Sequence, residues 1–198
     1  MIFDDRMDRL KRRAELASGK LLPDMVLTNC KVINVFNGKI IHGNIAIDGG
    51  KIIGIGPYEA KEKIDLGGAY VAPGLIDAHM HMESTLVTPG QMARIIVPRG
   101  TTTVVADPHE IANVLGIEGV EFMLDATEKT TLNGFFMLPS CVPSTDFETS
   151  GAKLSADKLS ELFNHPKVLG LGELMNYPGV IAGDTDMLEK MNMAQSKI

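Results

Sequence analysis

The chain has 198 residues, of which 44% are hydrophobic and 22% are charged, and its formal net charge is −6. This composition excludes a disordered protein, and the length can bury one large core or two small ones. The acidic balance argues against a general nucleic-acid-binding surface, and the apolar runs fall far short of the roughly 18 residues of a membrane-spanning helix. The charged N-terminal residues and the two lone cysteines, Cys30 and Cys141, predict a cytoplasmic protein with reduced thiols.

The first 70 residues show two patterns. Apolar residues recur at helical spacing over 3–17 with charges between them, which predicts a short amphipathic helix within an N-terminal segment, residues 1–23. Short β-rich runs follow, separated by Asn-Gly and Gly-Gly turns that are typical of hairpins. We therefore expect a small antiparallel, sandwich-like β unit over residues 24–70.

After Tyr70 the pattern changes to strands that alternate with helices over residues 71–198. The predicted strands lie near 71–78, 101–106, 134–138 and 168–172, and the predicted helices lie near 89–98, 116–129, 155–164 and from Asp184 onward. This alternation predicts βαβ units and a parallel sheet. Four βα units are half of those in a closed (β/α)8 barrel. The expected fold class is therefore α/β, either as half a barrel or as an open four-stranded sheet.

Two histidines, His79 and His81, end the apolar stretch PGLIDAHMH. Side chains at positions i and i+2 of a strand point to the same side, so both imidazoles can bind one ion. The carboxyl end of a parallel strand is also where barrel enzymes place their active sites. This position favours a metal site over a pair of buried structural histidines.

The stretch DPHE places Asp107, His109 and Glu110 directly after the next predicted strand. All three are side chains that can bind a metal or a substrate. The same stretch also suits a helix start, with Asp107 as the cap and Glu110 interacting with the helix dipole. Because capping does not need His109, a functional role is favoured, although both interpretations can hold together.

Glu173 ends the fourth predicted strand, after the stretch LGLG. A carboxylate at the end of an apolar strand is costly to bury unless it is paired or bound to a metal. On the fourth strand it can face the histidines of the first strand, so a metal ligand is favoured over a structural salt bridge. Glu83, in the loop after HMH, is a candidate for orienting the substrate or the ligands.

The stretch VAPGLIDAHMHMES resembles the amidohydrolase superfamily of metal-dependent hydrolases, whose layout also places a small β unit before the barrel. Three further stretches, PRGTTTVVADPHEIANVLG, SCVPSTDFETSGA and GLGELMNYPGVIAGD, narrow the resemblance to the bacterial adenine deaminase family. The resemblance implies the N-terminal part of a TIM-like (β/α)8 barrel. It also implies hydrolysis of adenine to hypoxanthine and ammonia by a metal-activated hydroxide.

The resemblance further implies roles for individual residues. His79 and His81 would be ligands of a binuclear divalent metal centre, with Mn or Fe favoured over Zn. Glu173 would take the place where many superfamily members have a bridging carboxylated lysine. Asp107 and His109 would be additional metal ligands. Glu110 and Glu83 would be catalytic groups on the substrate side.

In the family that the sequence resembles, the remaining ligands are histidines of strands five and six and an aspartate of strand eight, which fall beyond these 198 residues. We therefore expect a homo-oligomer or a missing C-terminal half, because an open sheet exposes an apolar edge. The expected partner is a small-molecule substrate, adenine, with no nucleic acid and no membrane. Two other functions remain open: a cyclic amidohydrolase of the dihydroorotase or hydantoinase kind, and a non-catalytic truncated or interaction module.

Overall fold

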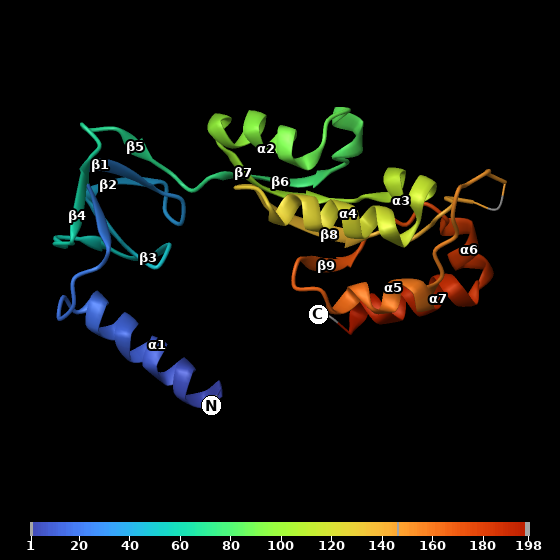
Figure 1. Cartoon of the computed structure of the whole chain (residues 1–198), viewed down its shortest axis with the longest axis horizontal. Helices are drawn as coiled ribbons and strands as arrows, with labels where there is room; N and C mark the ends of the chain where they lie inside the picture. Colours follow the sequence, from blue (N-terminus) through green and yellow to red (C-terminus); the bar gives the residue numbers. More distant parts are fainter. Residues whose placement is uncertain (1, 146, 197–198) are drawn as a thin grey trace. The chain divides into compact units, whose positions relative to one another are not determined.

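The computed structural model describes residues 2–145 and 147–196 of the chain (Figure 1). The chain divides into two compact units, Met1–Pro73 and Gly74–Ile198. Each unit has its own sheet and its own buried cluster, so each is described by itself. Among the helices of the described residues, none combines the length and the apolar character needed to cross a membrane.

From residue 2 onward, the described part of the first unit contains one helix and one five-stranded sheet. Helix α1 (Ile2–Ala17) confirms the predicted N-terminal helix. The strands are ordered β3-β2-β1-β4, with β5 also paired to β1, and their bounds are β1 Met25–Asn34, β2 Lys39–Asp48, β3 Lys51–Gly56, β4 Glu62–Asp65 and β5 Tyr70–Val71. The β1–β2 and β2–β3 pairs are antiparallel, as the turns predicted, but β4 and β5 run parallel to β1. The prediction of a purely antiparallel unit was therefore wrong, because turn residues specify hairpins and say nothing of strands that pair across longer connections.

The Asp24 side chain connects the turn between β2 and β3 with the segment just before β4. Its carboxylate accepts a hydrogen bond from the backbone amide of Gly49 at 3.0 Å and one from the Lys61 ammonium at 3.0 Å. The Gly49 amide first, and Lys61 second, hold the pKa of Asp24 below its ordinary value. A lowered pKa in the folded state stabilises the fold above the unfolded pKa, and this contribution is lost as the pH falls through the folded pKa.

We expect the substitution Asp24→Asn to flatten the acid limb of the stability–pH curve. Thermal melts between about pH 6 and pH 3 measure this, since that range brackets the ordinary carboxyl pKa. Lys61→Met is the graded comparison: it keeps the larger Gly49 interaction, so part of the Asp24 contribution to the slope should remain. A slope for Asp24→Asn equal to that of the wild type would contradict the assignment.

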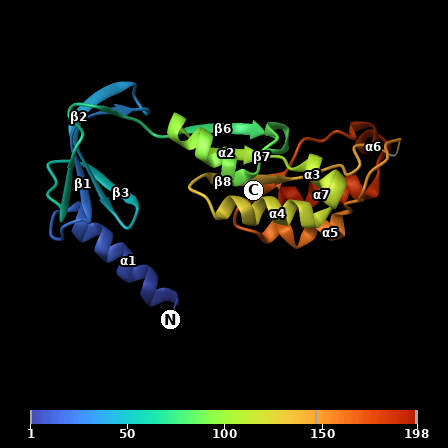
Figure 2. The same cartoon turned by 45° about the horizontal axis from the view of Figure 1, so that its top comes forward.

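The second unit is a four-stranded parallel sheet in the order β6-β7-β8-β9 (Figures 1 and 2). The strands are β6 Leu75–Met80, β7 Thr101–Ala106, β8 Asn133–Leu138 and β9 Val168–Leu171. In the part of the chain that the structure describes, β6 and β9 pair with one strand each, so the sheet is open. The predicted α/β fold with four parallel strands is confirmed.

The connections between the strands contain helices at the predicted places, one helix at the start that the stretch DPHE suits, and one helix that was not predicted. Helices α2 (Pro89–Ile96), α4 (Ile117–Glu128), α5 (Ala156–Ser160) and α7 (Thr185–Gln195) match the predicted ones, three of them with shorter bounds. Helix α3 (His109–Leu115) begins within the stretch DPHE, and helix α6 (Tyr177–Ala182) is additional. The strand predicted near 71–78 instead begins at Leu75, because Tyr70–Val71 pairs with β1 of the first unit.

One face of the parallel sheet carries the core. Alternate residues of β7 and β8 are buried: Val104, Ala106, Phe136 and Leu138. Helices α2 and α4 pack in the same cluster through Met92, Ala93, Val120, Met123 and Leu124. In both views α4 lies alongside β8 (Figures 1 and 2). The parallel pairing of β6 with β7, β7 with β8 and β8 with β9 brings the carboxyl ends of the four strands to one edge of the sheet.

Candidate metal centre

Four strands end at the same edge of the sheet, and each is followed by a polar residue of the site. His81 follows β6, Asp107 follows β7, and Ser140 and Glu173 come two residues after β8 and β9. Parallel strands bring their carboxyl ends together, and open or closed α/β folds place their active sites there. Residues more than 90 positions apart in the sequence thereby reach one site.

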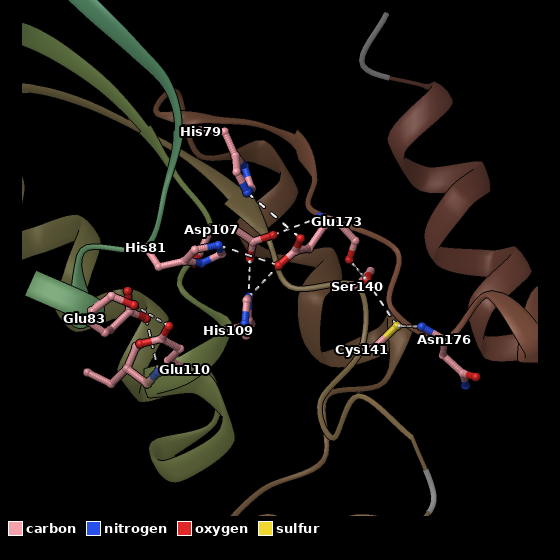
Figure 3. Close-up of polar contacts among 12 residues, drawn as sticks. His79, His81, Glu83, Asp107, His109, Glu110, Ser140, Cys141, Glu173 and Asn176 are labelled. Carbon is pink, nitrogen blue, oxygen red and sulfur yellow. Dashed lines mark hydrogen bonds and ion pairs between the residues drawn. The ribbon is translucent and has the colours of Figure 1, made fainter.

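The carboxylate of Glu173 lies among three imidazoles (Figure 3). Its Oε2 is 4.0 Å from Nε2 of His79, and its Oε1 is 3.7 Å from Nε2 of His81 and 3.6 Å from Nδ1 of His109. Two atoms that each bind one ion at about 2.1 Å lie roughly 3–4 Å from one another. These separations therefore suit ligands that surround a shared cation better than direct hydrogen bonds.

The tautomer of His81 is determined by its backbone contact. Its Nδ1 lies 2.9 Å from the carbonyl oxygen of Asp107. A carbonyl can only accept, so Nδ1 carries the proton and donates it. In the neutral ring this leaves the lone pair on Nε2, the atom that faces Glu173. A backbone carbonyl that orients an imidazole in this way is the usual partner of a metal-binding histidine.

Asp107 and His109 leave two buried polar atoms without hydrogen-bond partners. Asp107 is 1% exposed, and its Oδ2 accepts a hydrogen bond from the backbone amide of Glu173 at 2.9 Å. Its Oδ1 lies 3.4 Å from Nδ1 of His109, and both of these atoms are buried without a hydrogen-bond partner. Such atoms are costly to bury. A cation bound between them would satisfy both, so these residues fit a metal site.

The alternative role of Asp107, as a helix cap, is wrong. Helix α3 does begin at His109, but its N-cap residue is Pro108 and the helix has no side-chain cap. The Asp107 carboxylate instead accepts a hydrogen bond from the amide of Glu173, two residues after the end of β9. The predicted helix start is therefore correct, whereas the residue expected to cap it belongs to the site.

Three overlapping sets of potential ligands are present among the described residues. Within each set the ligand atoms lie within 4.8 Å of one another, and the sets are His79–His81–Glu173, His81–His109–Glu110 and Asp107–His109–Glu173. Each set combines imidazole nitrogens with carboxylate oxygens, a donor mixture suited to Mn, Fe and Zn. Because the sets share residues, neighbouring cation positions could have common ligands.

The two glutamates expected on the substrate side occupy different surroundings. Glu110 belongs to a set with His81 and His109, and its Oε1 accepts a hydrogen bond from Ser84 at 2.7 Å. Glu83 instead accepts a hydrogen bond at Oε1 from the amide of Ile111 at 3.1 Å, and its Oε2 is buried without a partner. Glu83 and Ser84 therefore attach the loop after β6 to the first turn of α3, and Glu83 lies beside Glu110 in Figure 3.

Two residues of the site were not predicted. The Ser140 hydroxyl donates a hydrogen bond to the backbone carbonyl of Glu173. Gly172 allows Asp107 to approach the chain, because a Cβ at this glycine would lie 2.1 Å from Oδ2 of Asp107. Ser140 could have been suspected from its place just after the third predicted strand. The need for glycine at 172 depends on a contact with a residue 65 positions earlier.

The chain is similar to curated adenine deaminases along most of its length. It is 51% identical to an adenine deaminase of Clostridium acetobutylicum over 187 residues, which cover 94% of this chain and 33% of that protein. It is 50% identical to adenine deaminase 2 of Carboxydothermus hydrogenoformans over 192 residues, which cover 97% of this chain and 34% of that protein. The chain thus spans about one third of the length of these relatives.

Solved structures share the fold at low sequence identity. An N-acyl-D-glutamate deacylase from Bordetella bronchiseptica has a TM-score of 0.60 at 17% identity, and the match covers 89% of this chain and 44% of that chain. A triazine hydrolase from Arthrobacter aurescens also has a TM-score of 0.60, at 18% identity, with coverage of 87% and 50%. The sequence profile of the amidohydrolase family matches residues 70–197, which include the whole parallel sheet and all the candidate ligands. The chain belongs to the amidohydrolase family.

Proposed function

We propose that this chain supplies the metal-binding part of an adenine deaminase, which hydrolyses adenine to hypoxanthine and ammonia. The observation that carries the proposal is the Glu173 carboxylate, which lies among His79, His81 and His109 at the carboxyl ends of parallel strands. The choice of adenine as substrate is supported by the relatives, which are curated adenine deaminases at about 50% identity along most of this chain.

The proposed ligand roles follow the geometry. His79 and His81 would bind one cation together with Glu173, and Asp107 and His109 would bind a second that shares the Glu173 carboxylate. The chemistry that divalent cations would supply when held by these residues is a lowered pKa of water, which would make hydroxide available for attack at C6 of adenine. We propose a binuclear Mn or Fe centre, the preference that the resemblance to the adenine deaminases implies, with Zn as the alternative, since nitrogen and oxygen donors suit all three metals.

Glu110 and Glu83 are the proposed substrate-side groups. Glu110 shares a ligand-type set with His81 and His109, so its carboxylate is close enough to exchange a proton with a substrate held at these histidines. Ser84 donates to Glu110 and restrains it. Glu83 has a buried unpaired oxygen at the same loop, and it could bind a polar group of the substrate there.

The proposal includes the setting of the enzyme. We propose a cytoplasmic protein that acts in adenine catabolism or purine salvage, either as a homo-oligomer or completed by further chain. The open sheet supports such completion, because the edge strand β6 exposes Leu75 and Ile76 at 64% and 65%.

The test is an assay of the full polypeptide that carries this sequence, supplied with Mn²⁺ or Fe²⁺. We expect ammonia release from adenine that a chelator abolishes and that added metal restores. Hydantoin and a dihydropyrimidine serve as competing substrates. A Glu173→Gln preparation, purified in parallel, controls for deaminase from the expression host.

Each outcome of this assay decides between the functions. Metal-dependent deamination of adenine supports the proposal. Ring opening of hydantoin or the dihydropyrimidine without deamination of adenine would replace it with a cyclic amidohydrolase. Turnover of none of these substrates by a metal-loaded, folded protein would overturn the proposal in favour of a non-catalytic module.

A further inference from the structure

The backbone of Glu173 is held from both sides. Its amide donates to Oδ2 of Asp107 at 2.9 Å, and its carbonyl accepts a hydrogen bond from the Ser140 hydroxyl. Figure 3 shows Ser140 at the backbone of Glu173, with the three histidines around the carboxylate. Since the peptide groups on both sides of the Glu173 Cα are restrained, the carboxylate extends from a fixed point. Ser140 therefore contributes to the position of Glu173 without contacting its carboxylate.

A buried lysine in turn holds Ser140. The side chain of Lys190, on α7, is 2% exposed, and its Nζ has three partners. These are the carbonyl oxygens of Ser140 at 3.0 Å and Leu154 at 2.6 Å, and Oδ2 of Asp186 at 2.7 Å. Lysine is seldom fully buried, and an ammonium in the interior is tolerated only when its donors are satisfied. The three partners meet that condition and connect α7 to the loop after β8.

We infer that Ser140 and Lys190 are positioning residues of the candidate metal centre. Lys190 holds the loop after β8 through the Ser140 carbonyl, and the Ser140 hydroxyl holds the carbonyl of Glu173. The inference rests on the proposed function, because it takes Glu173 as a metal ligand. It predicts that loss of either group weakens cation binding although neither group contacts the cation.

The chain offers a matched control for the Ser140 hydroxyl. Thr127, on α4, is 2% exposed, and its hydroxyl donates to the carbonyl of Met123 at 2.7 Å. Ser140→Ala and Thr127→Val each remove one buried hydroxyl that binds a backbone carbonyl. Ser140 lies at the ligand-bearing edge of the sheet, whereas Thr127 lies within a helix. A difference between the two variants in cation affinity therefore reports on position and not on stability alone.

The experiment is a calorimetric titration of the full polypeptide that carries this sequence with Mn²⁺ alone, accompanied by thermal melts of the metal-free protein. We expect Ser140→Ala to weaken Mn²⁺ binding by roughly 10- to 100-fold, as the loss of other groups that orient metal ligands does. Thr127→Val should bind Mn²⁺ like the wild type, although the melting temperatures of Thr127→Val and Ser140→Ala should fall by comparable amounts. Lys190→Met should weaken binding in the same direction, and Ser140→Ala decides the matter if Lys190→Met fails to fold.

The outcomes separate this inference from the proposed function. No Mn²⁺ binding by the wild type would overturn the proposed metal centre, and the inference with it. Binding by the wild type and equally tight binding by Ser140→Ala would overturn the inference and leave the metal centre standing. Equal weakening by Ser140→Ala and Thr127→Val would also overturn it, because the effect would then follow stability.

Discussion

Replacing Glu173 with glutamine is expected to weaken divalent-cation binding by roughly 100-fold or more, since losing even a group that only orients a ligand costs up to that factor. The substitution keeps the shape of the side chain but removes the charge that faces His79, His81 and His109. Glutamine also presents an amide group that cannot bind a cation through its nitrogen. Titrations with Mn²⁺ and Zn²⁺, each followed by calorimetry, measure the loss.

The stability of the metal-free protein should change little in this variant. The Glu173 side chain is 43% exposed, and the separations between its carboxylate and the three imidazoles are 3.6 Å or longer. Glu161→Gln is the matched control, because Glu161 is an exposed glutamate of the same unit. Both variants should melt like the wild type, and only Glu173→Gln should lose the cation. Equal Mn²⁺ affinity for the two variants would contradict the role of Glu173.

Much of the second unit could be predicted because its signals are local. The strand at Thr101–Ala106 was predicted with its bounds, since a β-rich run is followed by Asp107-Pro108. Helix α4 was predicted within one residue at each end. The sequence indicated only the start of α3, and α6 was missed, because these helices have seven and six residues, too few for a helical period to appear.

Two features could not be predicted from local sequence patterns: the parallel strand pairs of the first unit and the residue at which β6 begins. The parallel pairing of β4 and β5 with β1 joins segments about 40 residues apart, and no turn motif encodes it. The apolar run from Val71 was interpreted as one strand, yet its first residue pairs with β1 and β6 begins at Leu75. The segment between β5 and β6 contains Gly74, where a Cβ would lie 1.9 Å from Oγ1 of Thr102. This close approach between distant residues favours glycine at that position, and no local pattern indicates it.

The candidate site divides in the same way. The ligand-type residues could be predicted because each follows a recognisable strand, and parallel strands must end together. The roles of Ser140, Gly172 and Lys190 could not, because these roles are hydrogen bonds and close approaches between distant segments. The three residues contribute no ligand-type atom to the candidate sets, and only Ser140 has a signal in the sequence, its place just after a predicted strand.

Of the substitutions proposed, Gly172→Ala is expected to have the largest combined effect on the stability of the fold and on the Mn²⁺ affinity of the site. The added Cβ would lie 2.1 Å from Oδ2 and 2.7 Å from Cγ of Asp107. Asp107 is 1% exposed, and the same Oδ2 accepts the amide of Glu173, so it cannot retreat without breaking that bond. We expect the free energy of unfolding to fall by about 1–3 kcal/mol, the usual cost of overpacking. Mn²⁺ affinity should fall as well, since the clash separates Asp107 from Glu173.

Gly170→Ala isolates the cause. Neither Gly170 nor Gly172 has a positive φ, so the backbone of alanine suits both positions. At Gly170 the added Cβ would lie 3.4 Å from Cε of Met137, the flexible end of a side chain that can move aside. Chemical denaturation and Mn²⁺ titration of the two variants should therefore diverge, with Gly170→Ala close to the wild type. If both variants kept wild-type stability and affinity, Asp107 would not be the rigid link between β7 and Glu173, and the buried contact could not be what aligns the two carboxylates.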